Sequence, residues 1–86
     1  MKVHELKIWH KYCIQIVLGY KTFEIRKNDR NYQVGDILHL KETNDDTDEY
    51  TGFEMFVIVK YIHEGLGLQE GYICMAFKTV EIKQSN

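Results

Sequence analysis

The chain contains no proline, so its turns depend on glycine, asparagine and aspartate. It has only two cysteines, Cys13 and Cys74, which lie far apart and outside any C-x-x-C spacing. Free buried thiols are therefore favoured over a disulfide. The four histidines form neither an H-x-H nor an H-E-x-x-H pattern. We therefore expect no metal site and no cofactor.

Long apolar runs are also missing. No stretch of about 18 apolar residues could span a bilayer, and residues 1–5 lack the apolar core of a secretory signal. We expect no membrane partner and a cytoplasmic location. With 86 residues, the chain is long enough for one small core, so residues 1–86 are expected to form a single domain.

Charge is concentrated in the segment from Gly19 to Arg30. Four cations and two anions lie there, within a chain whose formal net charge is -2: Lys21, Glu24, Arg26, Lys27, Asp29 and Arg30. An acidic chain is unsuited to avid, nonspecific binding of duplex nucleic acid, which requires many neutralised phosphates. A compact basic cleft on an otherwise acidic body remains compatible with this composition.

Hydrophobic periodicity predicts a mainly β (α+β) fold. Alternation or β-branched content predicts strands at 3–9, 22–27, 37–41 and 50–62, and at 72–77 and 79–83 as one strand or two. Residues 11–18 carry apolar i, i+4 pairs and precede Gly19, which suits a left-handed C-terminal cap, so we expect a short helix there. Apolar residues occupy both faces of 50–62, as in a central strand covered by a helix. These elements predict a small, mainly antiparallel β-barrel with one short helix after the first strand.

Residues 22–27 are expected to place Phe23 and Ile25 on a packed face, with Glu24 and Arg26 on a polar face. Same-face neighbours lie roughly 6.6 Å apart along a strand, so the Glu24 carboxylate could hold the Arg26 guanidinium ready for a phosphate or a base. The simpler alternative is a solvated strand face whose ion pair contributes about 0 to 1 kcal/mol.

Three other segments have mainly structural interpretations. His4 is expected to be a partly buried, hydrogen-bonding histidine. Val34-Gly35-Asp36 predicts a tight entry into the next strand, for which Gly35 provides backbone freedom. Residues 42–49 are acidic and lack the calcium-loop pattern, so we expect a solvated loop that would repel phosphate near the basic segment.

Gly19, Lys21, Glu24 and Arg26 match the G-x-K-x-x-E-x-R signature of the ASCH (activating signal cointegrator homology) domains, which are grouped with the PUA-like barrels. The segments after it resemble a small, mostly bacterial and phage branch known as a domain of unknown function. They are Lys27-Asn28-Asp29-Arg30, Val34-Gly35-Asp36-Ile37-Leu38, Tyr50-Thr51-Gly52 and Gly71-Tyr72. The resemblance extends from about His4 to Phe77.

This resemblance implies a PUA-like barrel with an RNA-binding cleft beside the helix. Lys21 would provide a point charge for phosphate, Arg26 a bidentate fork, and Glu24 an orienting acceptor. Lys27 and Arg30 would extend the positive rim. Tyr20 or Tyr72 would offer a stacking face for a base. The implied partner is RNA or a nucleotide-like ligand.

The alternative is a small hydrolase, a ribonuclease or amidohydrolase acting on RNA or modified nucleosides. Lys21 would then act as a base beside Arg26, and Glu24 would shuttle protons. The amidohydrolase relatives have a threonine where this chain has Glu24, which argues against a covalent route through that position. A third alternative is a host or phage interaction protein, for which the sequence offers no exposed apolar stripe.

Overall fold

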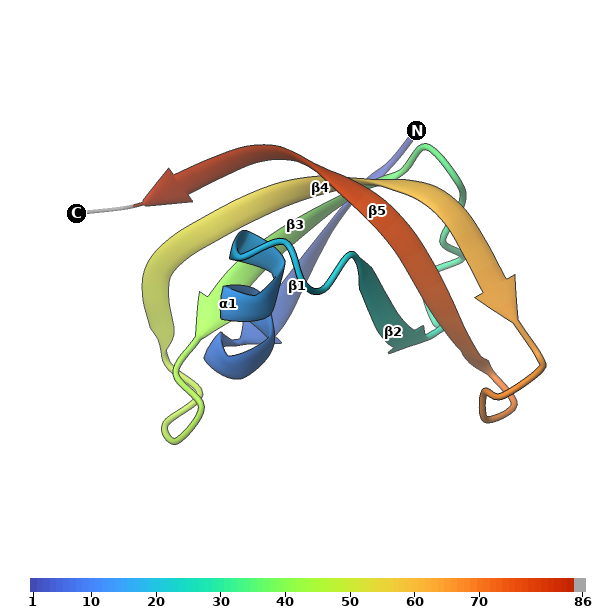
Figure 1. The fold of residues 1–86 in the computed structure, drawn as a ribbon, viewed down its shortest axis with the longest axis horizontal. Helices are drawn as coiled ribbons and strands as arrows, with labels where there is room; N and C mark the ends of the chain where they lie inside the picture. The colour runs from blue at the N-terminus through green and yellow to red at the C-terminus, as the bar shows by residue number, and fades with distance from the viewer. Residues whose placement is uncertain (85–86) are drawn as a thin grey trace.

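The computed structural model describes residues 1–84. Its elements follow in the order β1 (Val3–Trp9), α1 (His10–Val17), β2 (Phe23–Lys27), β3 (Ile37–Thr43), β4 (Tyr50–Glu64) and β5 (Tyr72–Gln84). The strands curl into a half-barrel, and α1 lies beneath it on the concave side (Figure 1). The prediction of a mainly β fold with one short helix after the first strand is confirmed.

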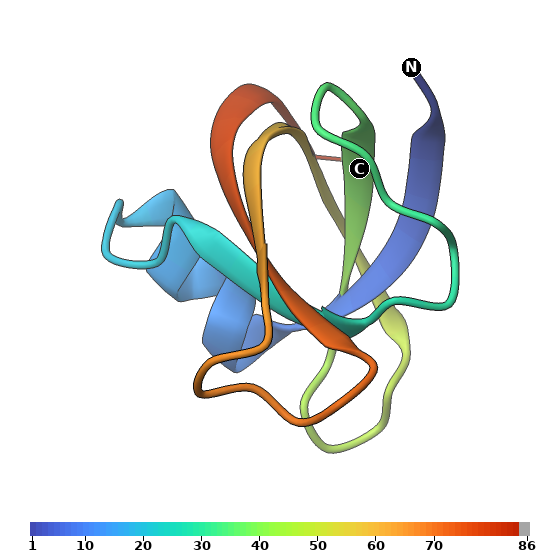
Figure 2. The ribbon, with the colours of Figure 1, turned by 90° about the vertical axis from the view of Figure 1, so that its right-hand side faces the viewer.

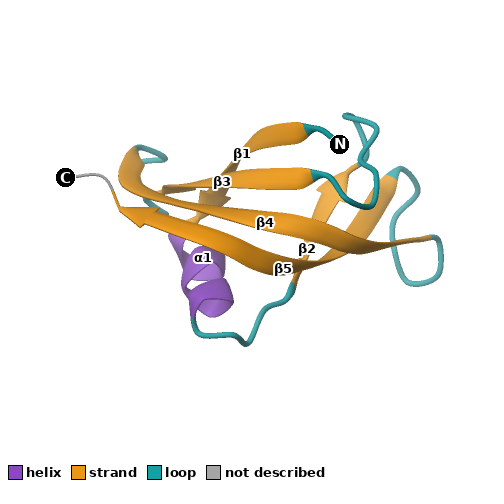
Figure 3. Cartoon of the chain, turned by 90° about the horizontal axis from the view of Figure 1, so that it is seen from above, coloured by secondary structure: helices purple, strands orange, loops and turns teal. Residues whose placement is uncertain are grey.

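One five-stranded sheet, in the order β1-β3-β4-β5-β2, makes up this half-barrel. Seen from above, β1, β3, β4 and β5 run side by side, with β2 and α1 beneath them (Figure 3). Three of the four strand pairings are antiparallel, whereas β1 and β3 are parallel. The chain therefore passes through α1 and β2 between two neighbouring strands, a crossover that the strand patterns did not indicate.

Alternating apolar residues supply the core, as expected for strands with one packed face. The buried members from the strands are Leu6, Ile8, Leu38, Leu40, Met55, Val57, Val59, Ile73, Met75 and Phe77. Helix α1 adds Cys13 and Ile16 to this cluster. The helix thus covers the open side of the curl with two buried side chains.

The connection from α1 to β2 is tight. Gly19 has a φ of 84°, and its N–H donates to the carbonyl of Ile16 at 3.0 Å. The N–H groups of Tyr20 and Lys21 both donate to the carbonyl of Gln15. The predicted glycine cap is confirmed, and it positions Lys21 at the corner between helix and strand.

The entry to β3 is fixed by a buried carboxylate. Asp36 is 2% exposed and accepts hydrogen bonds from the N–H groups of Lys2 and Gln33 and from Nε2 of His4 at 2.8 Å. Gly35 precedes it with a φ of 96°. The expectation of a buried, hydrogen-bonding His4 and of a structural role for this turn is confirmed.

One expectation is wrong in detail. Glu42, predicted to begin a solvated loop, lies inside β3, where it is buried and hydrogen-bonded to His10 and Thr51. Residues 72–77 and 79–83, expected to form one strand or two, form one, because β5 continues its pairing with β4 through irregularities in register. Within residues 1–84, no helix has the length and apolar character that a membrane crossing requires.

Candidate functional site

Strand β2 is oriented opposite to the prediction. Glu24 is 5% exposed, whereas Phe23 and Ile25 are 39% and 49% exposed. The strand therefore packs its charged face inward and presents its apolar face outward. A buried carboxylate requires compensation from charge and hydrogen bonds, and the neighbours of Glu24 supply both.

Lys21 and Arg26 hold Glu24 from two sides. Nζ of Lys21 lies 2.8 Å from Oε1, and Nε and Nη2 of Arg26 lie 2.8 Å and 2.7 Å from Oε2. The side chains of Lys21, Glu24 and Arg26 are 15%, 7% and 26% exposed. The three charged signature residues thus converge, as predicted, into one partly desolvated cluster with two cations and one anion.

Arginine side chains also connect β2 and the segment after it to β1. Nη2 of Arg26 donates to the carbonyl of Lys7 at 2.5 Å, and Nη1 of Arg30 donates to the carbonyl of Glu5 at 2.9 Å. Both carbonyls belong to β1, the strand at the opposite end of the sheet order from β2. These bonds satisfy carbonyls on an open sheet edge, where a strand otherwise leaves backbone groups unpaired.

A hollow of about 590 Å³ opens where β2 meets β1; we call it the signature hollow. Its lining residues are Lys7, Ile8, Trp9, Tyr12, Lys21, Phe23, Glu24, Ile25, Arg26 and Asp48. The rings of Trp9 and Tyr12 stack with centroids 6.1 Å apart and an interplanar angle of 21°. Nζ of Lys21 lies 5.5 Å from the Tyr12 ring centroid and 4.7 Å from that of Phe23. The hollow therefore combines aromatic faces with fixed cations.

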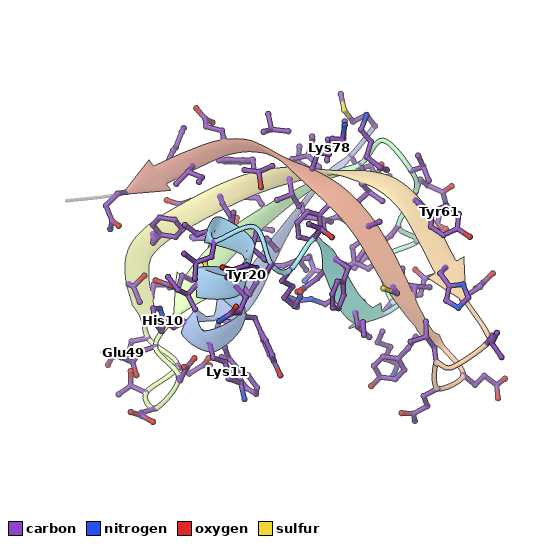
Figure 4. The ribbon with its side chains drawn as sticks, in the orientation of Figure 1. His10, Lys11, Tyr20, Glu49, Tyr61 and Lys78 are labelled. Atoms are coloured by element: carbon purple, nitrogen blue, oxygen red, sulfur yellow. The ribbon has the colours of Figure 1, made fainter. Side chains whose placement is uncertain are left out.

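The remaining predicted cations lie in a neighbouring hollow. Lys27 and Arg30 line a space of about 310 Å³, the basic hollow, which shares Ile25 and Arg26 with the signature hollow. Tyr72 also lines the basic hollow. Tyr20 lines neither of them and is 80% exposed, on the turn after α1 (Figure 4).

Sequence reasoning missed the residues that β1 and α1 contribute. Trp9 ends β1 and Tyr12 lies in the first turn of α1, so their stacking depends on the sharp junction between the two elements. A tryptophan three residues before a tyrosine at a strand-to-helix boundary is the signal that could have identified them. Lys7 is an exposed residue of β1 that no sequence motif singled out.

The acidic connection between β3 and β4 reaches the same site. Asp48 lines the signature hollow, and its Oδ2 lies 3.4 Å from Nζ of Lys7. Both side chains are more than half exposed, so this pair contributes little to stability. The acidic loop thus lies near the basic residues, as expected, and places one negative charge at the rim of the hollow.

Cys13 is not arranged as a nucleophile. Cys13 and Cys74 are free, and Cys13 is buried. Burial, reinforced by the nearby Glu42 carboxylate, raises the pKa of Cys13 to about 12. A thiol with such a pKa is protonated at neutral pH and unreactive. Residues 1–84 contain no group of three or more histidine, cysteine and acidic side chains placed to hold a metal ion.

From the end of the molecule, α1 lies on one side of the curl and the connection between β2 and β3 on the other (Figure 2). That connection contains Arg30, and the corner after α1 contains Lys21. The two segments flank β2, so this short strand positions Lys21, Arg26 and Arg30.

Comparison with known proteins identifies a relative and a family of this chain. An uncharacterized 12.9 kDa protein in the GpA 3' region of Escherichia phage P2 is 49% identical over 41 residues, which are 48% of this chain. The match spans 38% of that phage protein's length. A family model, described as Domain of unknown function (DUF3850), matches residues 3–77. Because this match covers most of the 86 residues, the chain belongs to the DUF3850 family.

Proposed function

We propose that the chain binds single-stranded RNA or a nucleotide-like ligand in the signature hollow. The observation that carries this proposal is the convergence of Lys21, Glu24 and Arg26 beside the stacked rings of Trp9 and Tyr12. A volume of about 590 Å³ is within the usual range of small-ligand pockets. Aromatic rings stack on bases regardless of sequence, and adjacent cations contact phosphate.

Hydrogen-bond donors remain available in the hollow. Lys21 uses two of its three N–H groups, for Glu24 and for the carbonyl of Phe23. Arg26 uses Nε and Nη2, and nothing in residues 1–84 accepts a hydrogen bond from its Nη1. Glu24 holds both cations in place, so a ligand meets donors whose positions are already fixed. This arrangement supports a binding role.

The resemblance to the ASCH signature supports the same role, because in that family the corresponding residues are proposed to line an RNA-binding cleft. The hydrolase alternative receives less support from the geometry. Nζ of Lys21 is held as a hydrogen-bond donor to the Glu24 carboxylate and to the carbonyl of Phe23, an arrangement that fits a ligand-binding group better than a general base.

Removing the aromatic faces is expected to weaken RNA binding. In a Trp9→Leu/Tyr12→Leu variant, the affinity for a single-stranded octanucleotide should fall at least tenfold, since base stacking contributes about 1 to 3 kcal/mol per base. Both residues are more than 40% exposed, so the fold should persist. Fluorescence anisotropy with labelled oligo(A) measures the effect.

Tyr61→Leu is the matched control, because Tyr61 is 62% exposed and lies far from α1 (Figure 4). Its affinity should equal that of the unaltered protein, and the RNA should be recovered intact after incubation. Equal affinity in the Trp9→Leu/Tyr12→Leu variant and in Tyr61→Leu would refute the proposal. RNA cleavage that disappears in Lys21→Ala would instead favour the hydrolase.

A further inference from the structure

The basic hollow has a different character from the signature hollow. Arg26, Lys27 and Arg30 line it, with Asp29 as its one acidic residue. Three cationic side chains line each hollow, but the signature hollow also contains two carboxylates, Glu24 and Asp48, so the basic hollow has the higher net positive charge. Its volume of about 310 Å³ suits a small, highly charged group.

The cations of the basic hollow are largely uncommitted. Within residues 1–84, the Lys27 side chain has no hydrogen bond or ion pair, and Arg30 uses only Nη1, for the carbonyl of Glu5. Asp29 lies beyond ion-pair distance of either. A phosphate could therefore meet the Lys27 ammonium and the free nitrogens of Arg30 without first displacing a carboxylate.

The two hollows are continuous along β2. Ile25 and Arg26 line both, so Arg26 lies between the signature hollow and the basic hollow. The charges of Arg30 and Arg26 also act on the hydroxyl of the buried Tyr32. Burial raises the pKa of Tyr32, and these two guanidinium groups act against that rise. Asp29 and Glu24 act in the opposite direction on the pKa of Tyr32, so cations and carboxylates both lie near this hydroxyl.

We infer that the basic hollow binds a backbone phosphate of an RNA strand whose neighbouring base occupies the signature hollow. This inference rests on the proposed function and narrows its ligand to a strand of at least two nucleotides. Arg26 lies between base and phosphate, Lys27 and Arg30 neutralise the phosphate, and Asp29 disfavours a second anion. Phosphate contacts of this kind position a strand and make its affinity depend on salt.

Four probes separate the contributions of base and phosphate: adenosine, adenosine monophosphate, the dinucleotide ApA and tetra-adenylate. Binding to the unaltered protein is measured by titration with NMR detection. ApA should bind about tenfold more tightly than adenosine and more tightly than the mononucleotide. In Lys27→Gln/Arg30→Gln, the advantage of ApA should disappear, whereas the affinity for adenosine should stay unchanged.

The matched control is Lys60→Gln/Lys78→Gln, which removes the same charge from two exposed residues outside both hollows. Lys78 lies on the side of the sheet away from α1 (Figure 4). The control should retain the ApA advantage. The logarithmic salt slope for tetra-adenylate should fall by about one unit in the Lys27→Gln/Arg30→Gln variant alone, since each contact to a single strand contributes roughly 0.7.

The Arg30→Gln change could also affect folding, because Arg30 donates a hydrogen bond to β1. The single variant Lys27→Gln avoids this effect. In that single variant, the salt slope should fall by about half as much as in the double variant. Retention of the ApA advantage in the double variant, or equal affinity of adenosine and ApA for the unaltered protein, would overturn the phosphate site while leaving the proposed function intact. Failure of all four probes to bind the unaltered protein would refute the proposed function itself, and this inference with it.

Discussion

Replacing Glu24 with alanine is expected to lower the free energy of unfolding by about 3 kcal/mol, because it leaves two partly buried cations without their shared carboxylate. Lys21 and Arg26 are 15% and 26% exposed, so water can compensate for only part of the loss. Arg26 would also lose the partner that aims its guanidinium at the carbonyl of Lys7. Urea denaturation followed by circular dichroism measures the change.

Glu81→Ala provides the control for this prediction. Glu81 is exposed and pairs with Lys83 only at 4.0 Å, so its removal should change stability by less than about 0.5 kcal/mol. A double-mutant cycle of Glu24→Ala with Arg26→Ala should show a coupling of about 1 to 2 kcal/mol. A loss below 1 kcal/mol in Glu24→Ala would mean that the cluster does not hold the seam between β1 and β2.

Asp36→Ala should have a similar effect, about 3 kcal/mol, for a different reason. Asp36 accepts hydrogen bonds from the Lys2 and Gln33 N–H groups and from His4, and all three donors lose their acceptor. Thermal and urea unfolding should both show the loss. Asp46→Ala, in the exposed loop, is the matched control, and it should leave the free energy of unfolding nearly unchanged.

The same carboxylate should make stability depend on pH. Burial alone would raise the pKa of Asp36, but the hydrogen bonds from His4 and from the Lys2 and Gln33 N–H groups outweigh it and lower the pKa below its ordinary 3.8. Its contribution is therefore complete above pH 3.8 and declines as the pH falls through the lower folded-state value. Asp36→Asn should be less stable than the unaltered protein at pH 7, and the difference should narrow as the solution is acidified below pH 3.8. A constant difference across this range would contradict the assignment.

Much of the fold was predictable, because local patterns determine it. Alternating apolar residues identified every strand, and Gly19 identified the end of α1 before its positive φ was known. The proximity of Glu24 to Arg26 followed from their spacing on one short strand, and the resemblance to the ASCH signature implied that Lys21 joins them. These features depend on residues within about eight positions of one another, where backbone geometry leaves few alternatives.

The orientation of β2 was not predictable from alternation. A period of two assigns Phe23 and Ile25 to one face and Glu24 to the other, but it does not identify the buried face. The apolar face was expected to pack, and the charged face packs instead because Lys21 and Arg26 compensate Glu24. Such compensation depends on three-dimensional pairing, so sequence alone favoured the wrong face.

Long-range contacts could not be predicted from the sequence either. The bond from Arg30 to the carbonyl of Glu5 spans 25 positions, and it depends on the parallel pairing of β1 with β3. Trp9 and Tyr12 reach the signature hollow only because β2 returns beneath the sheet. The site therefore has two functions in our account: its cations close the seam between the outer strands, and its rings and free donors face a ligand.

The most direct test uses the single tryptophan of the chain, Trp9, whose indole N–H gives one signal in a nitrogen-15 NMR spectrum. Titration with single-stranded octa-adenylate should move this signal saturably, together with the amide signals of Lys21, Phe23 and Arg26. Signals from Lys60 and Lys78 should stay in place. Saturable shifts confined to other surfaces, or no shift of the indole signal at millimolar RNA, would contradict the assignment of the signature hollow as an RNA-binding site.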